Sequence, residues 1–195
     1  MEYPLDMRFK ILAIAPQIHV TDARGESVCY VHQKLFRLKE AVSVFSDATK
    51  KQTLAEIKAD RVIDFSASYH FFDVGGESFG GVRRKGMKSL WSAHYDIVDE
   101  NNQPLGSITE ENPMAKVIDS LLSEVPLIGN FSGYFFNPRY LLSTAAGQPL
   151  MRLNKQPAMW EGKFLLEKLA PIEPVHELCY VMAFLMMTLL ERSRG

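Results

Sequence analysis

Near the end of the chain, residues 178–190 read LCYVMAFLMMTLL, and Thr188 is the only polar residue among them. A helix with this sequence is apolar on every side, so it must be surrounded by protein or by lipid. A helix that spans a membrane needs about 20 apolar residues, and this segment is shorter and bounded by Glu177 and Glu191. We therefore expect a helix in the core of the protein. A short membrane span is the alternative.

A repeated motif in the first half of the chain predicts β-hairpins. Four aspartates recur at nearly equal intervals, each two residues after an apolar residue: Asp22, Asp47, Asp73 and Asp99. Three residues after the Asp stands Gly25, Gly76 or Asn102 in three of the repeats. Asp at the start of a turn accepts hydrogen bonds from the backbone ahead of it, and Gly or Asn readily takes a positive φ. The second repeat has Lys50 at this position, so we expect a longer turn there.

The residues around these turns alternate as in half-buried strands, and Trp91, Ala93, Tyr95 and Ile97 give one such pattern. Four hairpins predict about eight antiparallel strands before residue 112. Asn112-Pro113 then starts an expected amphipathic helix over residues 113–123. Further strands are expected at four places: Tyr134–Phe136, Tyr140–Leu142, Leu150–Leu153 and Trp160–Leu169.

The dimensions of the terminal helix decide how these strands are arranged. A helix is about 10 Å wide with its side chains, too wide for an eight-stranded barrel filled by its own residues. A sheet that encloses a helix needs about eleven or twelve strands, which is also the number that the sequence predicts. We therefore expect a mainly β fold in one domain, residues 1–195. It is a closed antiparallel β-barrel of about twelve strands around a buried C-terminal helix.

The hairpin repeat at Asp22, Asp73 and Asp99, the strands that resume after the inserted helix and the terminal LCYVMAFLMMTLL resemble the LURP-one-related proteins. These belong to the tubby C-terminal-like group, together with the phospholipid scramblases. The resemblance covers nearly the whole chain and implies a closed barrel of twelve strands around a hydrophobic C-terminal helix. It also implies a link to lipids, because tubby proteins bind phosphoinositides and scramblases are linked to lipid movement. The phosphoinositide motif of tubby proteins has no match here, so no tubby binding residue is carried over.

Composition excludes several classes of protein. The apolar fraction is 47%, which is typical of a folded protein and argues against disorder. The formal net charge is −1, from 22 basic and 23 acidic residues, and this argues against a nucleic-acid binder. Two cysteines cannot form a disulfide scaffold and suit a reducing compartment. The N-terminus lacks the basic and apolar regions of a signal peptide. We expect a cytoplasmic protein, peripheral at a membrane.

The densest positive stretch is a candidate binding site for an anionic headgroup. It contains Arg83, Arg84, Lys85 and Lys88, and Lys34 is expected to lie beside it. Each cation near an anionic membrane surface contributes about 1 kcal/mol to binding. Lys50-Lys51 is expected to converge with this cluster on one end of the barrel. The alternative is a solvated strand end whose charges protect an edge of the sheet.

Neither a metal site nor a catalytic site is expected. The five histidines lie far apart in the sequence, and none belongs to a metal-binding motif. The glycine-rich stretch Gly75–Gly81 precedes strand-like residues instead of a helix, so we interpret it as a hairpin turn and not as a phosphate-binding loop. We expect a non-catalytic binding or scaffold domain without a cofactor, whose partner is anionic phospholipid or a protein. A scramblase-like membrane protein and an enzyme with a pocket at one end of the barrel are the alternatives.

Overall fold

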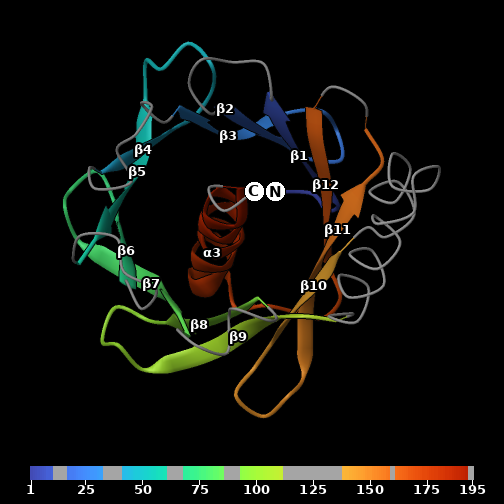
Figure 1. The fold of residues 1–195 in the computed structure, drawn as a ribbon. Helices are drawn as coiled ribbons and strands as arrows, with labels where there is room; N and C mark the ends of the chain where they lie inside the picture. The colour runs from blue at the N-terminus through green and yellow to red at the C-terminus, as the bar shows by residue number, and fades with distance from the viewer. Residues whose placement is uncertain are drawn as a thin grey trace, which may run out of the picture.

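A closed β-barrel with a helix inside it is the architecture of the protein (Figure 1). The computed structural model describes residues 1–10, 17–32, 41–60, 68–85, 93–111, 138–158 and 161–192. In this part of the chain, twelve antiparallel strands enclose one C-terminal helix, as the sequence predicts. The predicted helix over residues 113–123 and the predicted strand at Tyr134–Phe136 lie outside the described residues.

Neighbours in the sequence are neighbours in the barrel, and the first strand closes the sheet by pairing with the last. The strands are β1 (Leu5–Lys10), β2 (Gln17–Thr21), β3 (Ser27–His32), β4 (Val42–Phe45), β5 (Thr53–Ala59), β6 (Ser68–Phe72), β7 (Ser78–Arg84), β8 (His94–Val98), β9 (Pro104–Glu110), β10 (Arg139–Ser143), β11 (Pro149–Gln156) and β12 (Glu161–Lys168). The helix is α3 (Pro174–Arg192).

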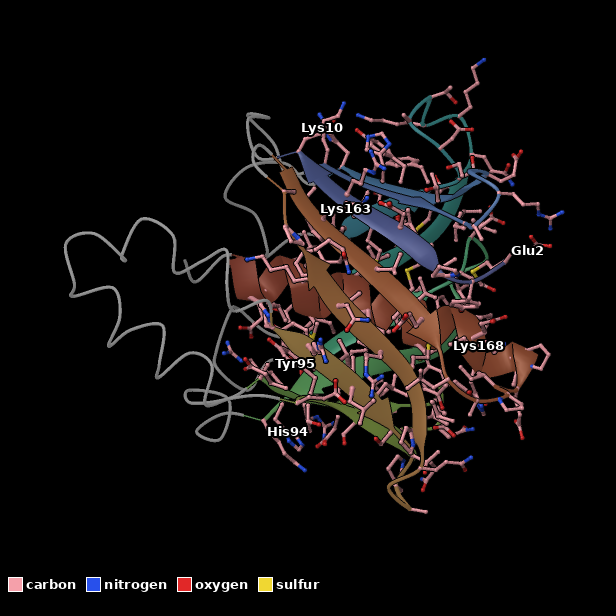
Figure 2. All side chains as sticks on the ribbon, turned by 90° about the vertical axis from the view of Figure 1, so that its right-hand side faces the viewer. Glu2, Lys10, His94, Tyr95, Lys163 and Lys168 are labelled. Carbon is pink, nitrogen blue, oxygen red and sulfur yellow. The ribbon has the colours of Figure 1, made fainter. Side chains whose placement is uncertain are left out.

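The barrel has two different ends. At the turn end, tight turns join β2 to β3, β4 to β5, β6 to β7, β8 to β9 and β10 to β11. The opposite end, where β1, β3, β5, β7, β9 and β11 finish, we call the loop end. Because β12 finishes at the turn end, α3 enters there and runs through the barrel toward the loop end. Figure 2 shows this side view, with Glu2 and Lys168 near the turn end and Lys10 toward the loop end.

The predicted Asp turns are present. The Asp22 carboxylate accepts backbone hydrogen bonds from Arg24 and Glu26 at 2.9 and 3.1 Å. Asp73 and Asp99 repeat this pattern, and the Gly or Asn three residues later has a positive φ in each turn.

The second turn is longer, also as predicted. There the closing backbone bond runs from Ser46 N to Gln52 O, whereas in the first turn it runs from Asp22 N to Glu26 O. Lys50 takes the positive φ, at 58°, in place of a glycine.

One strand was not predicted. The hairpin repeat predicts about eight strands before residue 112, and the structure has nine, because β1 precedes the first hairpin. Its sequence, LDMRFK, alternates between buried and exposed residues, with Leu5, Met7 and Phe9 facing the core. β1 pairs with both β2 and β12, so this strand closes the barrel.

The core consists of the inward faces of the strands and nearly the whole surface of α3. All residues from Cys179 to Leu190 are buried, including Thr188, whose hydroxyl donates to the carbonyl of Phe184 at 2.7 Å. By length and composition, Pro174–Glu191 could also cross a membrane, but 67% of this window is buried inside the barrel. The predicted burial of the apolar helix by the sheet is therefore confirmed.

Gly80 lets α3 approach the barrel wall closely. A Cβ atom at Gly80 would lie 2.6 Å from Cys179 Sγ and 2.7 Å from the carbonyl oxygen of Val98. Gly80 also has a φ of 137°, which other residues rarely adopt. A glycine is therefore required here twice, for the backbone conformation and for the packing of the helix.

Replacing Phe184 with Asp should leave little soluble protein, because the new carboxylate would be buried without a partner at a cost of several kcal/mol. Val175→Asp is the matched control, since Val175 lies on the same helix and is 69% exposed. Soluble yield and thermal melting of both variants test this. A Phe184→Asp variant that melts like the wild type would contradict the burial of α3.

Gly80→Ala should lower the free energy of unfolding by about 3 kcal/mol, because it adds a steric clash to an unfavourable φ. Gly25→Ala separates the two effects, since Gly25 has a φ of 84° but a Cβ added there would meet no atom within 4 Å. That variant should lose only about 1 kcal/mol. Urea denaturation measures both values, and equal losses would show that the contact with Cys179 has no energetic role.

Cys29 and Cys179 should not react with a thiol reagent in the native protein. Burial raises the pKa of both thiols to about 12, so both are protonated at neutral pH, and the reagent cannot reach them. Both should be labelled at once in guanidinium chloride. Fast labelling of Cys179 under native conditions would mean that α3 leaves the barrel readily.

Candidate functional site

The predicted basic cluster is divided by the alternation of β7. Arg83 points outward and is exposed, whereas Arg84 points into the barrel and is 8% exposed. Lys85 follows the strand on the outside. Lys34 and Lys88 lie outside the described residues. Arg83 and Lys85 are therefore the members of the cluster that the structure shows on the outer surface.

The two outward cations have different surroundings. The Nε of Arg83 donates to the hydroxyl of Ser68 at 3.0 Å, and no carboxylate lies within salt-bridge distance among the described residues. The Nζ of Lys85 lies 3.1 Å from an Asp96 carboxylate oxygen, in a half-exposed ion pair. Asp96 also stands opposite Arg83 in the β7–β8 register, so its carboxylate lies on the same face of the sheet as both outward cations.

The predicted convergence of Lys50-Lys51 with this cluster is wrong. These residues lie in the β4–β5 turn, at the turn end, whereas Arg83 and Lys85 lie at the loop end. The Asp turns all lie at the turn end, and β7 runs from one of them to the loop end, so Arg83 and Lys85 are a strand length away from Lys50-Lys51. The Nζ of Lys50 lies 5.8 Å from the ring centre of Tyr30, on the outside of the barrel.

Arg84 belongs to a polar cluster inside the loop end. Its guanidinium lies 6.0 Å from the ring centre of Tyr95 and 3.9 Å from a carboxylate oxygen of Glu191. Five adjacent strands each contribute one buried polar or aromatic side chain here, and α3 contributes a sixth: Tyr69, Arg84, Tyr95, Glu110, Tyr140 and Glu191. We call this group the interior cluster.

Burial keeps two phenols of the interior cluster, those of Tyr69 and Tyr140, protonated. The Tyr95 hydroxyl donates to Glu191 Oε1 at 2.6 Å. Burial, and then the charges of Glu110 and Glu191, raise the pKa of Tyr140 far above its usual range. Burial also raises the pKa of Tyr69. Tyr69 and Tyr140 are therefore protonated at neutral pH and do not act as bases there, while Tyr95 is the phenol that donates to a carboxylate.

The opposite side of the loop end is apolar. There the buried residues near the strand ends are Phe9, Ile18, Val31, Val42 and Ile57. Among the described residues, the buried polar side chains of the strands at this end thus lie on the β6–β10 side, which is also the side where α3 contacts β6, β7 and β8. The interior cluster was not predicted from the sequence.

Charge is distributed unevenly along the barrel axis. At the loop end, Lys10, Arg83 and Arg139 are exposed, and the described residues place no carboxylate within salt-bridge distance of them. At the turn end, the turns after β6 and β8 carry acids and no cations: Asp73, Glu77, Asp99 and Glu100. Among the described residues, the net charge of −1 therefore conceals exposed cations at the loop end and an acidic sector of the turn end.

Within the described ranges, no group of three or more His, Cys, Asp or Glu side chains is arranged to hold a metal ion. Cys29 faces the core, while His32, three residues later, lies on the other face of β3.

The comparisons with known proteins add nothing to this geometry: the chain matches no family model, no curated protein and no solved structure.

Proposed function

We propose that the protein is a non-catalytic binding domain whose loop end associates with an anionic phospholipid surface. The observation that carries this proposal is the position of Lys10, Arg83 and Arg139, which come from three separate strands and lie at one end of the barrel. They stand around the rim of this end, since β1 and β7 are opposite each other in the closed barrel, and cations around one rim attract an anionic surface that lies across it. The acidic turns at the other end would then face away from the membrane.

The packing of the barrel supports a binding role on the outside. α3 fills the axis of the barrel, and its residues from Cys179 to Leu190 are buried against the strands. Polar groups inside the loop end, such as Tyr95 and Glu191, bind each other. We therefore place the contact with the partner on the exposed cations and not in the interior.

The architecture supports a relationship to the LURP-one-related proteins. A twelve-stranded barrel around a C-terminal apolar helix is what the resemblance of the sequence implies, and the chain has this architecture. We include membership of the tubby C-terminal-like group in the proposal. The tubby and scramblase relationship favours lipid over protein as the partner of the loop end.

Neutralising the exposed loop-end cations should greatly weaken binding to acidic vesicles. In Lys10→Gln/Arg83→Gln/Arg139→Gln, the loss of about 1 kcal/mol per cation should weaken binding about a hundredfold. Co-sedimentation with vesicles of phosphatidylcholine, alone or with phosphatidylserine or phosphatidylinositol bisphosphate, measures this. Wild-type binding to the acidic vesicles should also fall when salt is raised.

Lys50→Gln/Lys51→Gln is the matched control, because it removes exposed charge at the turn end. It should pellet with acidic vesicles like the wild type. Equal pelleting of the triple variant and the wild type would refute the loop-end site. If the wild type does not pellet with any acidic vesicle, the lipid proposal fails, and a protein partner becomes the better explanation of the exposed cations.

A further inference from the structure

The apolar contacts of α3 do not by themselves fix how far the helix reaches into the loop end. Hydrophobic burial is non-directional and depends on area, so a helix that is apolar all round can rotate or shift at little cost in area. Hydrogen bonds and ion pairs have defined geometry and specify one position. Polar contacts between α3 and the wall therefore add to close packing, such as that of Cys179 against Gly80, in setting its position.

Such contacts exist at both ends of the helix. At the turn end, Lys168 Nζ lies 2.9 Å from Glu177 Oε1, which joins the end of β12 to the first turns of α3. At the loop end, Glu191 in the last turn accepts the 2.6 Å hydrogen bond from Tyr95 of β8 and faces Arg84 of β7. The loop-end contacts join residues about a hundred positions apart in the sequence.

Polar contacts matter more for the position of the last turn than for the middle of the helix, because apolar burial decreases toward the end of the helix. Residues Val181–Met186 are completely buried, whereas Leu189 and Leu190 retain slight exposure and the Glu191 side chain is 20% exposed. The last turn thus depends less on the hydrophobic effect than the middle of the helix does. A hydrogen bond to a charged group typically contributes about 1.5–3 kcal/mol, which is enough to decide whether one turn stays in place.

We propose that Arg84, Tyr95 and Glu191 form a clamp that holds the last turn of α3 against the ends of β7 and β8. When the clamp opens, this turn detaches while the rest of the helix stays buried. The clamp is a conformational device at the loop end, and it is independent of whether that end binds lipid. Arg84 and Tyr95 are positioning residues in this device.

The strands that supply the clamp also carry the outer cations. Arg83 and Arg84 are adjacent in β7 with their side chains on opposite faces, and Arg84 and Tyr95 are register partners. Directly beyond them, the backbone of Lys85 donates to the carbonyl of His94 at 3.0 Å. Opening of the clamp should therefore also loosen this terminal bond between β7 and β8.

Hydrogen exchange of the full chain tests the clamp. Tyr95→Phe and Glu191→Gln should each raise the exchange rate of amides 187–192 by about tenfold to a hundredfold. The amide of Lys85 should exchange faster as well. Amides 178–183, in the first buried turns, should keep their wild-type rates, because local opening leaves them enclosed. The double variant should exceed the faster single variant only slightly, since Tyr95→Phe removes the donor of the same hydrogen bond that Glu191→Gln weakens by removing the charge of its acceptor.

Lys168→Gln is the matched control, because it removes the polar contact at the other end of α3 and should leave amides 187–192 unchanged. Wild-type rates at 187–192 in both Tyr95→Phe and Glu191→Gln would overturn the proposal. An equal rise along the whole helix would also overturn it, since that indicates global destabilisation. If amides 187–192 of the wild type exchange as fast as an unstructured peptide, no clamp exists.

Discussion

The mutual burial of α3 and the inner face of the sheet is the interaction on which the rest of the structure depends. Full burial of one large apolar side chain contributes about 1.5–3 kcal/mol, and the helix is buried over nearly its whole surface from Cys179 to Leu190. Neither partner has another core available: without α3 the barrel would be hollow, and without the barrel the helix would expose apolar residues on every side. The width of a helix also fixes the number of strands needed to enclose it.

The sequence predicted this architecture because its two determinants are local. The apolar residues 178–190 and the Asp turns can each be recognised from a short stretch of sequence. The width of a helix then gives the number of strands that must enclose it. β1 was missed for a related reason. It alternates as regularly as any other strand, but the strands were predicted from the Asp turns, and the sequence between β1 and β2, ILAIAP, contains no Asp. Strand alternation in residues 5–10 was the available signal.

The polar groups at the loop end were harder to predict, because their arrangement depends on closure of the barrel. Arg83 and Arg84 are adjacent in the sequence, yet the alternation of β7 places one in solvent and the other beside Glu191. The interior cluster collects residues from five strands and the helix, and only the closed sheet brings them together. One indication was present: Arg84 stands two residues after Val82, on the face that Val82 assigns to the core. A charged residue at a core position predicts a buried partner.

The order of the elements along the chain has a consequence for biosynthesis. All twelve strands precede the helix that fills them, and β1 must wait for β12 before the sheet can close. A ribosome therefore exposes the apolar inner faces of nearly the whole nascent chain before α3 emerges. During that interval the unpaired edges of β1 and of the newest strand are open to pairing with other polypeptides. Chaperones that cover such edges should meet this chain early in translation, and a stop codon before α3 should yield a product destined for degradation.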